Sequence, residues 1–553
     1  MILEEATTSR RGFVGAAAAA AAALAVSATG CAAAPKSESS KAASSAAGSS
    51  AGTGETLLPN LENLEFHKPT AAPVAFVDGQ IADGDIKETI ECDVVVCGAG
   101  MAGATAAASC SQHGLTTVLL EKGATFAARG SEIGAIDDRA HKAAGVEIDK
   151  KKLLDDAMVS ADYRADRNVW KRYIDRSGEA MDWAIDTSEA TPGSKCGDFT
   201  VVGANTESDG VITWASGVRV AGGTPAFVEM MIENAKSHGA DVRYNTPACQ
   251  LVRDGEGAVT GVIAKADGSY IKFNAKKGVV LATGSYDQNW DILSQVARPR
   301  DLAVNAWINP TLTEAGDGHL MGQAVGAAID DLPHVLMNDP AGSTAGTRAN
   351  GAIFAFPRVN AEGKRFVNES LSFEFVTNSI MYQTGARDYL LMSGDLEAAF
   401  DTMKGVIPWK GSDLVAQCKD VLIEANSIDE LAEKIGVDKD ALKATVERYN
   451  EFCAKGVDED FGKNPTTLLP LDQAPFYALE ESGSCLVTVS GLKINEKSQV
   501  LDTKGAAIEG LYALGNTSGS MFFGTYPHHI SAVSHGRCVC FGYLVGRTLA
   551  GLE

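Results

Sequence analysis

A short apolar strand that runs into a glycine-rich turn places the strongest constraint on the fold of this chain. Residues 92–97 (Cys-Asp-Val-Val-Val-Cys) precede the pattern G-x-G-x-x-G at 98–103, and small residues from Ala104 to Ser109 predict a helix. A second strand is predicted over 116–120 and ends at Glu121. Strand, glycine turn, helix and acid-tipped strand are typical of the βαβ unit that binds dinucleotides. A tight βαβ turn without a ligand is the alternative.

Each part of this unit has a physical role. Gly98 permits the tight turn, Gly100 lets a pyrophosphate approach the backbone, and Gly103 lets the helix pack closely on the strand. The free N–H groups at the helix N-terminus favour phosphate. Glu121 can accept hydrogen bonds from a ribose.

The composition excludes some classes of function. The 553-residue chain is long enough for two or three domains, and its net charge of −23 argues against nucleic-acid binding. It contains no C-x₂-C pair, no C-x-x-C-H haem motif and no H-E-x-x-H helix, so no metal site is predicted. The eleven cysteines are scattered singly except Cys538 and Cys540, and we interpret them as buried small residues rather than a disulfide or redox framework.

The N-terminus has the form of a twin-arginine export signal. Residues 9–14 (Ser-Arg-Arg-Gly-Phe-Val) precede an alanine-rich run to Ala28 that is too short for a convincing membrane span. Cys31 follows a loose lipoprotein box, so a lipid anchor is an open alternative. Residues 32–90 are interpreted as a Ser/Ala-rich tether. We therefore expect the protein at the extracytoplasmic face of the cell membrane or in the periplasm.

The remaining chain mixes strands and helices. Amphipathic helix is predicted over 153–183, and residues 123–137 form a small-residue loop. Further predicted elements are helices 226–237, 439–455 and 537–549 and strands 241–244, 248–252, 259–266, 271–274, 278–284 and 351–356. Residues 344–482 mix short predicted strands with charged predicted helices, and we interpret this part of the chain as an inserted lobe. The predicted divisions are 1–31 signal, 32–90 tether, 91–343 and 483–553 cofactor-binding domain, and 344–482 capping domain.

Together these pieces resemble the fumarate reductase/succinate dehydrogenase flavoprotein family, which also contains 3-ketosteroid dehydrogenases. The resemblance covers residues 91–553 and rests on markers in family order. Besides the glycine turn and Glu121, these are the segments 282–284 (Ala-Thr-Gly), 316–318 (Gly-Asp-Gly), 363–369 (Gly-Lys-Arg-Phe-Val-Asn-Glu), 491–495 (Gly-Leu-Lys-Ile-Asn) and 510–516.

The resemblance implies an α/β fold, with a Rossmann-like FAD-binding domain and an inserted α+β capping domain. It also implies non-covalent FAD, with the substrate between the lobes and water excluded by closure. The cofactor-binding residues that it implies are Gly98, Gly100, Met101, Ala102, Gly103, Glu121, Lys122, Gly130, Ser131, Cys249, Ala282, Thr283, Gly284, Asp317, Gly515 and Asn516.

The chain departs from the fumarate-type members at the positions that grip a dicarboxylate. Their His-Pro-Thr corresponds to residues 338–340 (Asn-Asp-Pro), and their proton-donating Arg corresponds to Phe373. A further His corresponds to Leu486, and the last carboxylate-binding Arg to Tyr526. Arg binds carboxylates through two points, which Phe and Tyr cannot do. Fumarate and succinate are therefore not the expected substrates.

The C-terminal motif at 515–527 resembles the 3-ketosteroid dehydrogenase branch, in which the Tyr of a Thr-Tyr-Pro triplet binds a ketone oxygen. This residue is Tyr526, and it is followed by His528 and His529, where the steroid enzymes have small residues. Either imidazole could donate a proton or bind an oxyanion, or both could be structural. Arg348 is a candidate for a proton relay or for a lobe-closing salt bridge, and Glu374 could replace the missing Arg in proton delivery.

The sequence thus predicts an exported FAD-dependent reductase of an activated, uncharged C=C bond such as an enone or acrylate-like group. Electrons would come from an external carrier such as a membrane-linked cytochrome, because the chain has no haem motif of its own. Two alternatives remain open. One is a ketosteroid-type dehydrogenase that runs in the oxidative direction, and the other is a tethered binding lipoprotein without catalysis.

Overall fold

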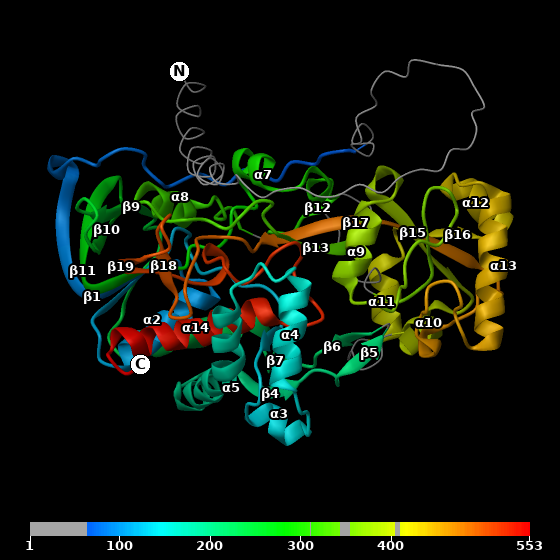
Figure 1. Ribbon diagram of the computed structural model, residues 1–553, viewed down its shortest axis with the longest axis horizontal. Helices are drawn as coiled ribbons and strands as arrows, with labels where there is room; N and C mark the ends of the chain where they lie inside the picture. The colour runs from blue at the N-terminus through cyan, green and yellow to red at the C-terminus, as the bar shows by residue number, and fades with distance from the viewer. Residues whose placement is uncertain (1–63, 209, 310, 343–353, 404–409) are drawn as a thin grey trace, which may run out of the picture.

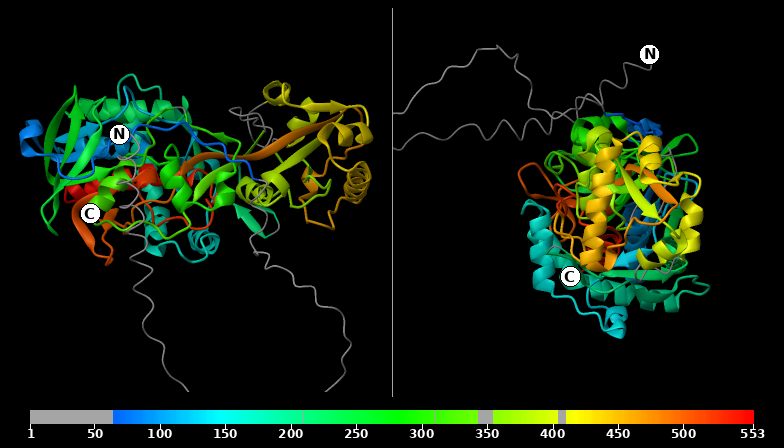
Figure 2. Two further views of the ribbon diagram at one scale, coloured as in Figure 1. Left: turned by 90° about the horizontal axis from the view of Figure 1, so that it is seen from above. Right: turned by 90° about the vertical axis from the view of Figure 1, so that its right-hand side faces the viewer.

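The computed structural model describes residues 64–553, except 209, 310, 343–353 and 404–409. The protein has a larger lobe, which contains the first and last helices, and a smaller lobe built mostly from the residues between 354 and 482 (Figure 1). The view from above shows the two lobes end to end (Figure 2). The α/β fold with an inserted capping domain that the sequence predicts is confirmed.

An eight-stranded sheet forms the centre of the larger lobe. Its strands run in the order β18-β19-β11-β1-β2-β8, with β10 paired to β11 and β9 paired to β10. β1 is parallel to β2 and β11, so the carboxyl ends of these three strands meet at one edge. The strands are β1 (Ile86–Cys97), β2 (Thr117–Leu120), β8 (Asp241–Arg243), β9 (Ala248–Arg253), β10 (Val259–Ala266), β11 (Ser269–Leu281), β18 (Gln499–Leu501) and β19 (Ala507–Ala513).

Two helices from opposite ends of the chain pack against each other beside this sheet. α2 (Met101–Gln112) follows the glycine turn, and α14 (Val533–Leu549) is the last helix (Figure 1). A Cβ added at Gly546 would lie 2.2 Å from Ser109 Oγ, and one added at Gly542 would lie 3.0 Å from the Ala102 carbonyl. Glycines on α14 and small residues on α2 therefore permit a closer approach than larger side chains would allow.

The other elements of the larger lobe surround this centre. They are α3 (Arg139–Ala144), α4 (Lys150–Ser160), α5 (Arg167–Ala190), α6 (Gly223–Ser237), α7 (Trp290–Val296), α8 (Asp317–Ala324) and the short strands β3 (Glu132–Gly134), β4 (Gly197–Val201), β5 (Thr206–Ser208), β6 (Val211–Thr213) and β7 (Gly217–Ala221). The helix predicted over 153–183 is two helices, α4 and α5. The chain turns between them at Asp162 and Tyr163, which have positive φ, and Asp166 caps the start of α5.

The capping lobe is organised around one long strand, β17 (Phe476–Thr488). One half of β17 pairs with β15 and β16, and the other half pairs with β13 and β12. The strands are β12 (Ala306–Trp307), β13 (Leu336–Gly342), β14 (Arg358–Val359), β15 (Arg387–Ser393) and β16 (Ile423–Ala425), and the helices are α9 (Phe373–Met381), α10 (Leu396–Met403), α11 (Gly411–Cys418), α12 (Ile428–Ile435) and α13 (Lys439–Lys455). No strand forms over Phe354–Phe356, where one was predicted, because these side chains pack into an apolar cluster with Phe400.

The family marker at residues 363–369 forms the ionic core of this lobe. The Arg365 guanidinium donates to both oxygens of Glu369, at 2.9 and 2.8 Å, and to both oxygens of Asp458, at 3.2 and 2.7 Å. All three side chains are buried. Since each carboxylate is paired in two-point fashion, the cluster supports the lobe despite the cost of burying charge.

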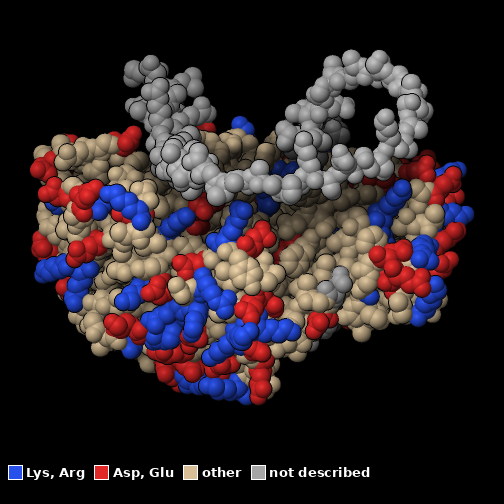
Figure 3. All heavy atoms as spheres, viewed as in Figure 1, with Lys and Arg blue, Asp and Glu red and all other residues tan. Residues whose placement is uncertain are grey.

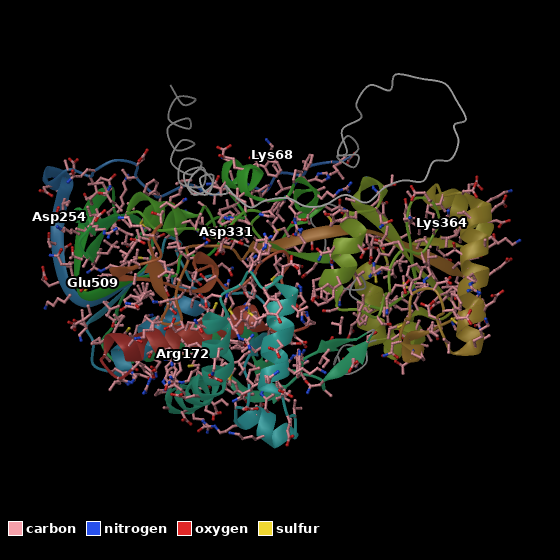
Figure 4. All side chains as sticks on the ribbon, viewed as in Figure 1. Lys68, Arg172, Asp254, Asp331, Lys364 and Glu509 are labelled. Atoms are coloured by element: carbon pink, nitrogen blue, oxygen red, sulfur yellow. The ribbon has the colours of Figure 1, made fainter. Side chains whose placement is uncertain are left out.

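The segment before β1 differs from the predicted tether. Residues 64–85 run along the larger lobe from α7 to β9 (Figure 1). Asp317 Oδ1 accepts the backbone N–H groups of Ala75 and Phe76, and the Cys249 carbonyl accepts that of Val77. Lys68 lies beside α7 in Figure 4, with its ammonium 5.3 Å from the Trp290 ring centre. The described part of the predicted tether therefore packs on the fold.

Charged side chains of both signs are interspersed on the face shown in Figure 3, over both lobes. Within the described ranges, no helix combines the length and the apolar character that crossing a membrane requires.

Candidate active site

Two connected cavities lie along the carboxyl edge of the central sheet. The larger has a volume of about 460 Å³ and the smaller about 80 Å³. The same residues line both where they meet: Gly100, Ala127, Ala282, Gly284 and Glu314. The capping lobe contributes the far wall of the larger cavity. This arrangement suits an elongated ligand with one end between the lobes.

The glycine turn forms the floor of the cavities. Gly98 has φ +104°, and a Cβ there would lie 2.2 Å from the Ala282 carbonyl oxygen. A Cβ on Gly103 would lie 1.8 Å from the Gly98 carbonyl oxygen. Only glycine allows the turn at Gly98 to lie this close to Ala282, and the first turn of α2 to lie this close to Gly98. The packing therefore agrees with the roles that the sequence analysis gave to Gly98 and Gly103.

Gly100 differs from Gly98 and Gly103, because its missing side chain leaves open space in the cavity and is not required by a close backbone contact. The nearest atom to a Cβ added there is the Ala127 carbonyl oxygen, 3.7 Å away, so a side chain at this position would project into the cavity. Gly100 also caps α2 without a side chain, which leaves the N–H groups of the first helical turn available. An open cradle at a helix N-terminus fits the pyrophosphate of a dinucleotide.

The smaller cavity contains the acidic residue at the end of β2. Glu121 accepts hydrogen bonds from the N–H groups of Ala99 and Gly123, at 2.8 and 2.7 Å. Burial raises the pKa of Glu121, and these two N–H groups oppose that shift. Each carboxylate oxygen keeps a second lone pair for a ribose hydroxyl.

Lys122 and Asp317 form an ion pair of 2.7 Å at the rim of the smaller cavity. Asp317 also holds the segment before β1, as described above. These two residues therefore link the wall of the cavity to the N-terminal segment.

The structure brings together most of the residues that the resemblance assigned to FAD. The larger cavity is lined by Gly100, Met101, Ala102, Gly130, Ser131, Ala282, Gly284, Gly515 and Asn516, and the smaller by Gly98, Gly100, Glu121, Lys122, Ala282, Thr283, Gly284 and Asp317. Gly103 lies beneath the floor. Cys249 lines neither cavity, and its side chain packs with Ile81 and Ile263, so its contact with FAD stays a prediction.

A buried pair of acids, Glu314 and Asp287, lies beside the junction of the cavities. The N–H of Ser285 donates to Glu314, and the Ser285 hydroxyl donates to Asp287. Burial and the neighbouring Asp287 raise the pKa of Glu314 to about 7, while Arg129 opposes the shift. At neutral pH the pair therefore holds less than two negative charges beside the cavity.

Tyr526 lies in the wall of the larger cavity with its hydroxyl at the start of α14. The N–H of Ser534 donates to the Tyr526 hydroxyl oxygen at 2.9 Å. Burial raises the pKa of the Tyr526 phenol, although Ser534 and Arg537 oppose the shift. Because the oxygen accepts from the helix N-terminus, its own proton remains available to a ligand in the cavity.

His528 lines the cavity between two carboxylates from different elements. Its Nε2 lies 3.1 Å from Asp339 Oδ1 on β13, and its Nδ1 lies 3.9 Å from Glu374 Oε2 on α9. Phe373 and Tyr526 flank the ring, with ring centres 4.1 and 4.5 Å away. Asp339 and His528 face the cavity, whereas Glu374 lies behind them. At 3.1 Å the Asp339 carboxylate lies close enough to pair with the imidazole, whereas the 3.9 Å to Glu374 exceeds hydrogen-bond length.

His529 and Glu374 do not line the cavities. Both are buried, and His529 donates to Glu374 Oε1 from its backbone N–H and from Nδ1, each at 3.0 Å. Arg348 lies outside the described residues. The sequence analysis did not single out Asp339 or Ser534, although residues 338–340 were noted as a departure from the family. The signal for Asp339 was the departure at residues 338–340, which places an acid where the fumarate-type members have His-Pro-Thr.

The protein combines a dinucleotide-binding α/β core with a capping lobe that closes one end of the cavity. This arrangement is typical of a redox enzyme with a buried cofactor. The family model described as FAD binding domain matches residues 93–531, so the chain belongs to this family.

The chain is 28% identical to the vinyl phenol reductase of Lactiplantibacillus plantarum, covering 82% of this chain and 94% of that protein. It is 27% identical to the fumarate reductase (cytochrome) of Shewanella frigidimarina, covering 83% of this chain and 77% of that protein. The 3-ketosteroid-Δ4-(5α)-dehydrogenase of Rhodococcus jostii has the same fold, with a TM-score of 0.68 over 88% of this chain and all of that chain at 22% identity.

These findings confirm the predicted family, the fumarate reductase/succinate dehydrogenase flavoproteins. The protein is an FAD-dependent oxidoreductase that acts on CH–CH bonds.

Proposed function

We propose that the protein reduces a C=C bond conjugated to a carbonyl or comparable electron-withdrawing group on a flat, uncharged substrate. The observation that carries the proposal is the wall of the larger cavity opposite the glycine turn. Met337, Phe373, Leu486 and Tyr526 form an apolar and aromatic surface there, and Asp339 and His528 are its polar groups. Such a wall suits a planar apolar guest with one hydrogen-bonding oxygen.

The charges of the cavity argue against a dicarboxylate. Among the described residues that line the larger cavity, Arg129 is the one Arg or Lys, and its guanidinium donates to the Ile308 carbonyl. The acids Glu132, Glu314 and Asp339 line the same cavity. A second carboxylate on the substrate would meet acids rather than the Arg clamp it needs. The similarity to a vinyl phenol reductase supports a substrate of the aromatic, uncharged kind.

The residues of the chain divide the chemistry between them. FAD, when bound, supplies the hydride from N5 to the β-carbon of the substrate. The Tyr526 hydroxyl donates a hydrogen bond to the activating oxygen and stabilises the negative charge that develops there. His528, on the neighbouring wall, is the residue that we propose to give a proton to the α-carbon. The apolar wall excludes water from the reacting atoms.

A substrate screen tests this proposal. The holoenzyme would be assayed anaerobically with dithionite-reduced methyl viologen and with enones, hydroxycinnamate-like acrylates, vinyl phenols, fumarate and urocanate as acceptors. We expect reoxidation with an uncharged conjugated alkene, such as an enone or a vinyl phenol, and none with fumarate. Preference for fumarate would contradict the proposal. Turnover only with saturated ketones and an artificial electron acceptor would favour the dehydrogenase direction instead.

We further propose export by the twin-arginine route, with electrons from an external carrier such as a membrane-linked cytochrome. The motif at residues 9–14 supports export, and the similarity to a cytochrome-type fumarate reductase supports an external donor. A lipid anchor at Cys31 belongs to the same proposal. Replacing both Arg10 and Arg11 by Lys should retain the protein in the cytoplasm, which cell fractionation would measure.

A further inference from the structure

The junction of the two cavities combines a carboxyl group with the glycine cradle described above. Glu314 and Gly100 each line both cavities. The Glu314 carboxyl group lies directly on Gly284, because a Cβ added at this glycine would lie 2.1 Å from Glu314 Oε2. Any dinucleotide that occupies both cavities crosses this junction, and its pyrophosphate is anionic. An ionised Glu314 therefore opposes the binding of the cofactor that the cradle favours.

A single hydroxyl group lies between the carboxyl groups of Glu314 and Asp287. The Ser285 hydroxyl donates to Asp287, and its oxygen lies 3.1 Å from Glu314 Oε2. A hydroxyl has one hydrogen, so it cannot donate to both carboxylates at once. When both acids are ionised, one carboxylate oxygen faces the Ser285 oxygen without a hydrogen between them. A proton on Glu314 completes the line, since Glu314 then donates to Ser285 and Ser285 donates to Asp287.

The surroundings of the two acids also disfavour a double negative charge. Asp287 is fully buried, and its second oxygen accepts the Asn309 amide at 3.0 Å. Burial and the neighbouring Asp287 raise the pKa of Glu314 to about 7, and burial raises the pKa of Asp287. Arg129 opposes both shifts. The pair therefore binds its shared proton near neutral pH before any ligand is present.

The other charged groups around the junction do not supply the missing positive charge. Lys122, on the adjoining wall, is paired with Asp317 at 2.7 Å. Glu121 adds a further acid to the smaller cavity. On the side of β17, burial raises the pKa of the Cys485 thiol, so this group stays neutral. An anionic ligand at the junction consequently meets more acids than bases unless the pair holds its proton.

We propose that the line Glu314–Ser285–Asp287 takes up one proton from solvent when FAD fills the junction and releases it when FAD leaves. The inference goes beyond the reaction with the substrate, because it concerns how tightly the chain holds its cofactor. An anionic ligand beside the pair favours the protonated form, so the pKa of Glu314 is higher with FAD bound than without it. FAD binding is then tightest below about pH 7 and weakens as the pH rises above that value.

The sharpest test measures the release of FAD from the holoenzyme as a function of pH. The holoenzyme would be diluted at values between about pH 6 and about pH 8, and the fluorescence of released FAD would give the dissociation constant. We expect this constant to rise about 10-fold over the range, with the slope of one proton above about pH 7. A constant value across the range would overturn the proposal.

A change at Glu314 separates proton uptake from a fixed charge. Glu314→Gln keeps an oxygen that accepts the Ser285 N–H but cannot ionise. We expect E314Q to match the wild type at about pH 6 and to bind FAD about 10-fold more tightly than the wild type at about pH 8. An equal gain in affinity at both pH values would reveal a permanent charge on Glu314 and would overturn the proposal.

The matched control for E314Q is Asp330→Asn. Burial also raises the pKa of Asp330, to about 6, but Asp330 lines neither cavity. D330N should therefore keep the wild-type pH dependence of FAD binding. Asp287→Asn tests the pairing, because it removes the neighbouring charge that raises the pKa of Glu314. The weakening of FAD binding should begin at a lower pH in D287N, and an unchanged pH dependence would exclude Asp287 from the line.

A second readout observes the proton itself in the folded holoenzyme. The C=O stretching band of a protonated carboxyl group is distinct from the bands of a carboxylate in the infrared spectrum. At about pH 8 this band should be stronger in the wild-type holoenzyme than in E314Q holoenzyme, whereas D330N should resemble the wild type. Identical spectra of wild type and E314Q would overturn the proposal. Neither measurement uses a substrate, so failure of the proposed reductase activity and failure of this proton site remain distinguishable.

Discussion

Replacing Tyr526 by Phe has two consequences that the structure separates. The first is a loss of stability, because the half-buried Ser534 N–H at the start of α14 loses the hydroxyl of the buried Tyr526 as its acceptor. An unsatisfied buried donor costs about 1–3 kcal/mol. The second is a loss of rate, because the phenol is the oxyanion donor that we propose. Removing one such donor lowers kcat by about 10²–10³-fold, which corresponds to about 2.7–4 kcal/mol.

The matched control is Tyr543→Phe. Tyr543 is also buried, and its hydroxyl donates to Glu179 at 2.9 Å, but it does not line the cavity. Urea unfolding would measure the stability of both variants, and anaerobic methyl viologen oxidation would measure turnover at equal flavin content. We expect both variants to lose stability and Tyr526→Phe alone to lose rate. A Tyr526→Phe enzyme with wild-type kcat would refute the assignment of the phenol as oxyanion donor.

Three further predictions concern the cofactor, the cap and pH. Gly100→Val should abolish flavin binding yet leave the fold intact, measured by flavin absorbance and circular dichroism, whereas Gly84→Val, also in open space, should bind flavin normally. Arg365→Leu should lower the free energy of unfolding by about 3–5 kcal/mol, measured by urea, because it removes the guanidinium that pairs two buried carboxylates. Glu369 then keeps only the more distant Lys463 Nζ, at 3.7 Å, and Asp458 keeps backbone N–H donors. A loss below about 1 kcal/mol would contradict this reasoning. Burial raises the pKa of Asp330 to about 6, so the folded state holds this proton more tightly than the unfolded state. The wild type should then lose about 3 kcal/mol of stability as pH rises from about 4 to 6, and Asp330→Asn should lack this slope.

The βαβ unit could be predicted from the sequence because its signals are local. Gly98 and Gly103 each meet a backbone carbonyl within a few residues or on the adjacent turn, and the residue pattern reports those contacts directly. Phe373, Leu486 and Tyr526 are far apart in the chain, and only the family resemblance indicated that they share a site. The structure places all three in the wall of one cavity.

Other features left no pattern in the sequence. The segment 64–85 is held in part through backbone N–H groups, which every residue except proline possesses, so its composition resembles a tether. Ser160, the last residue of α4, contacts the His529 ring at 3.2 Å and belongs to no sequence motif. Its position beside His529 follows from how α4 packs against the loop before α14, and that is a property of the tertiary structure alone.

The continuous strand β17 joins the outer part of the cap to the wall of the cavity. Its first half belongs to the outer part of the cap, and its second half carries Leu486 and Val487 into the wall of the cavity (Figure 1). An uninterrupted strand bends or twists rather than pivoting at one residue. A displacement of the outer cap would therefore be passed along β17 to Leu486 and Val487, and would change the shape of the cavity wall at the same time.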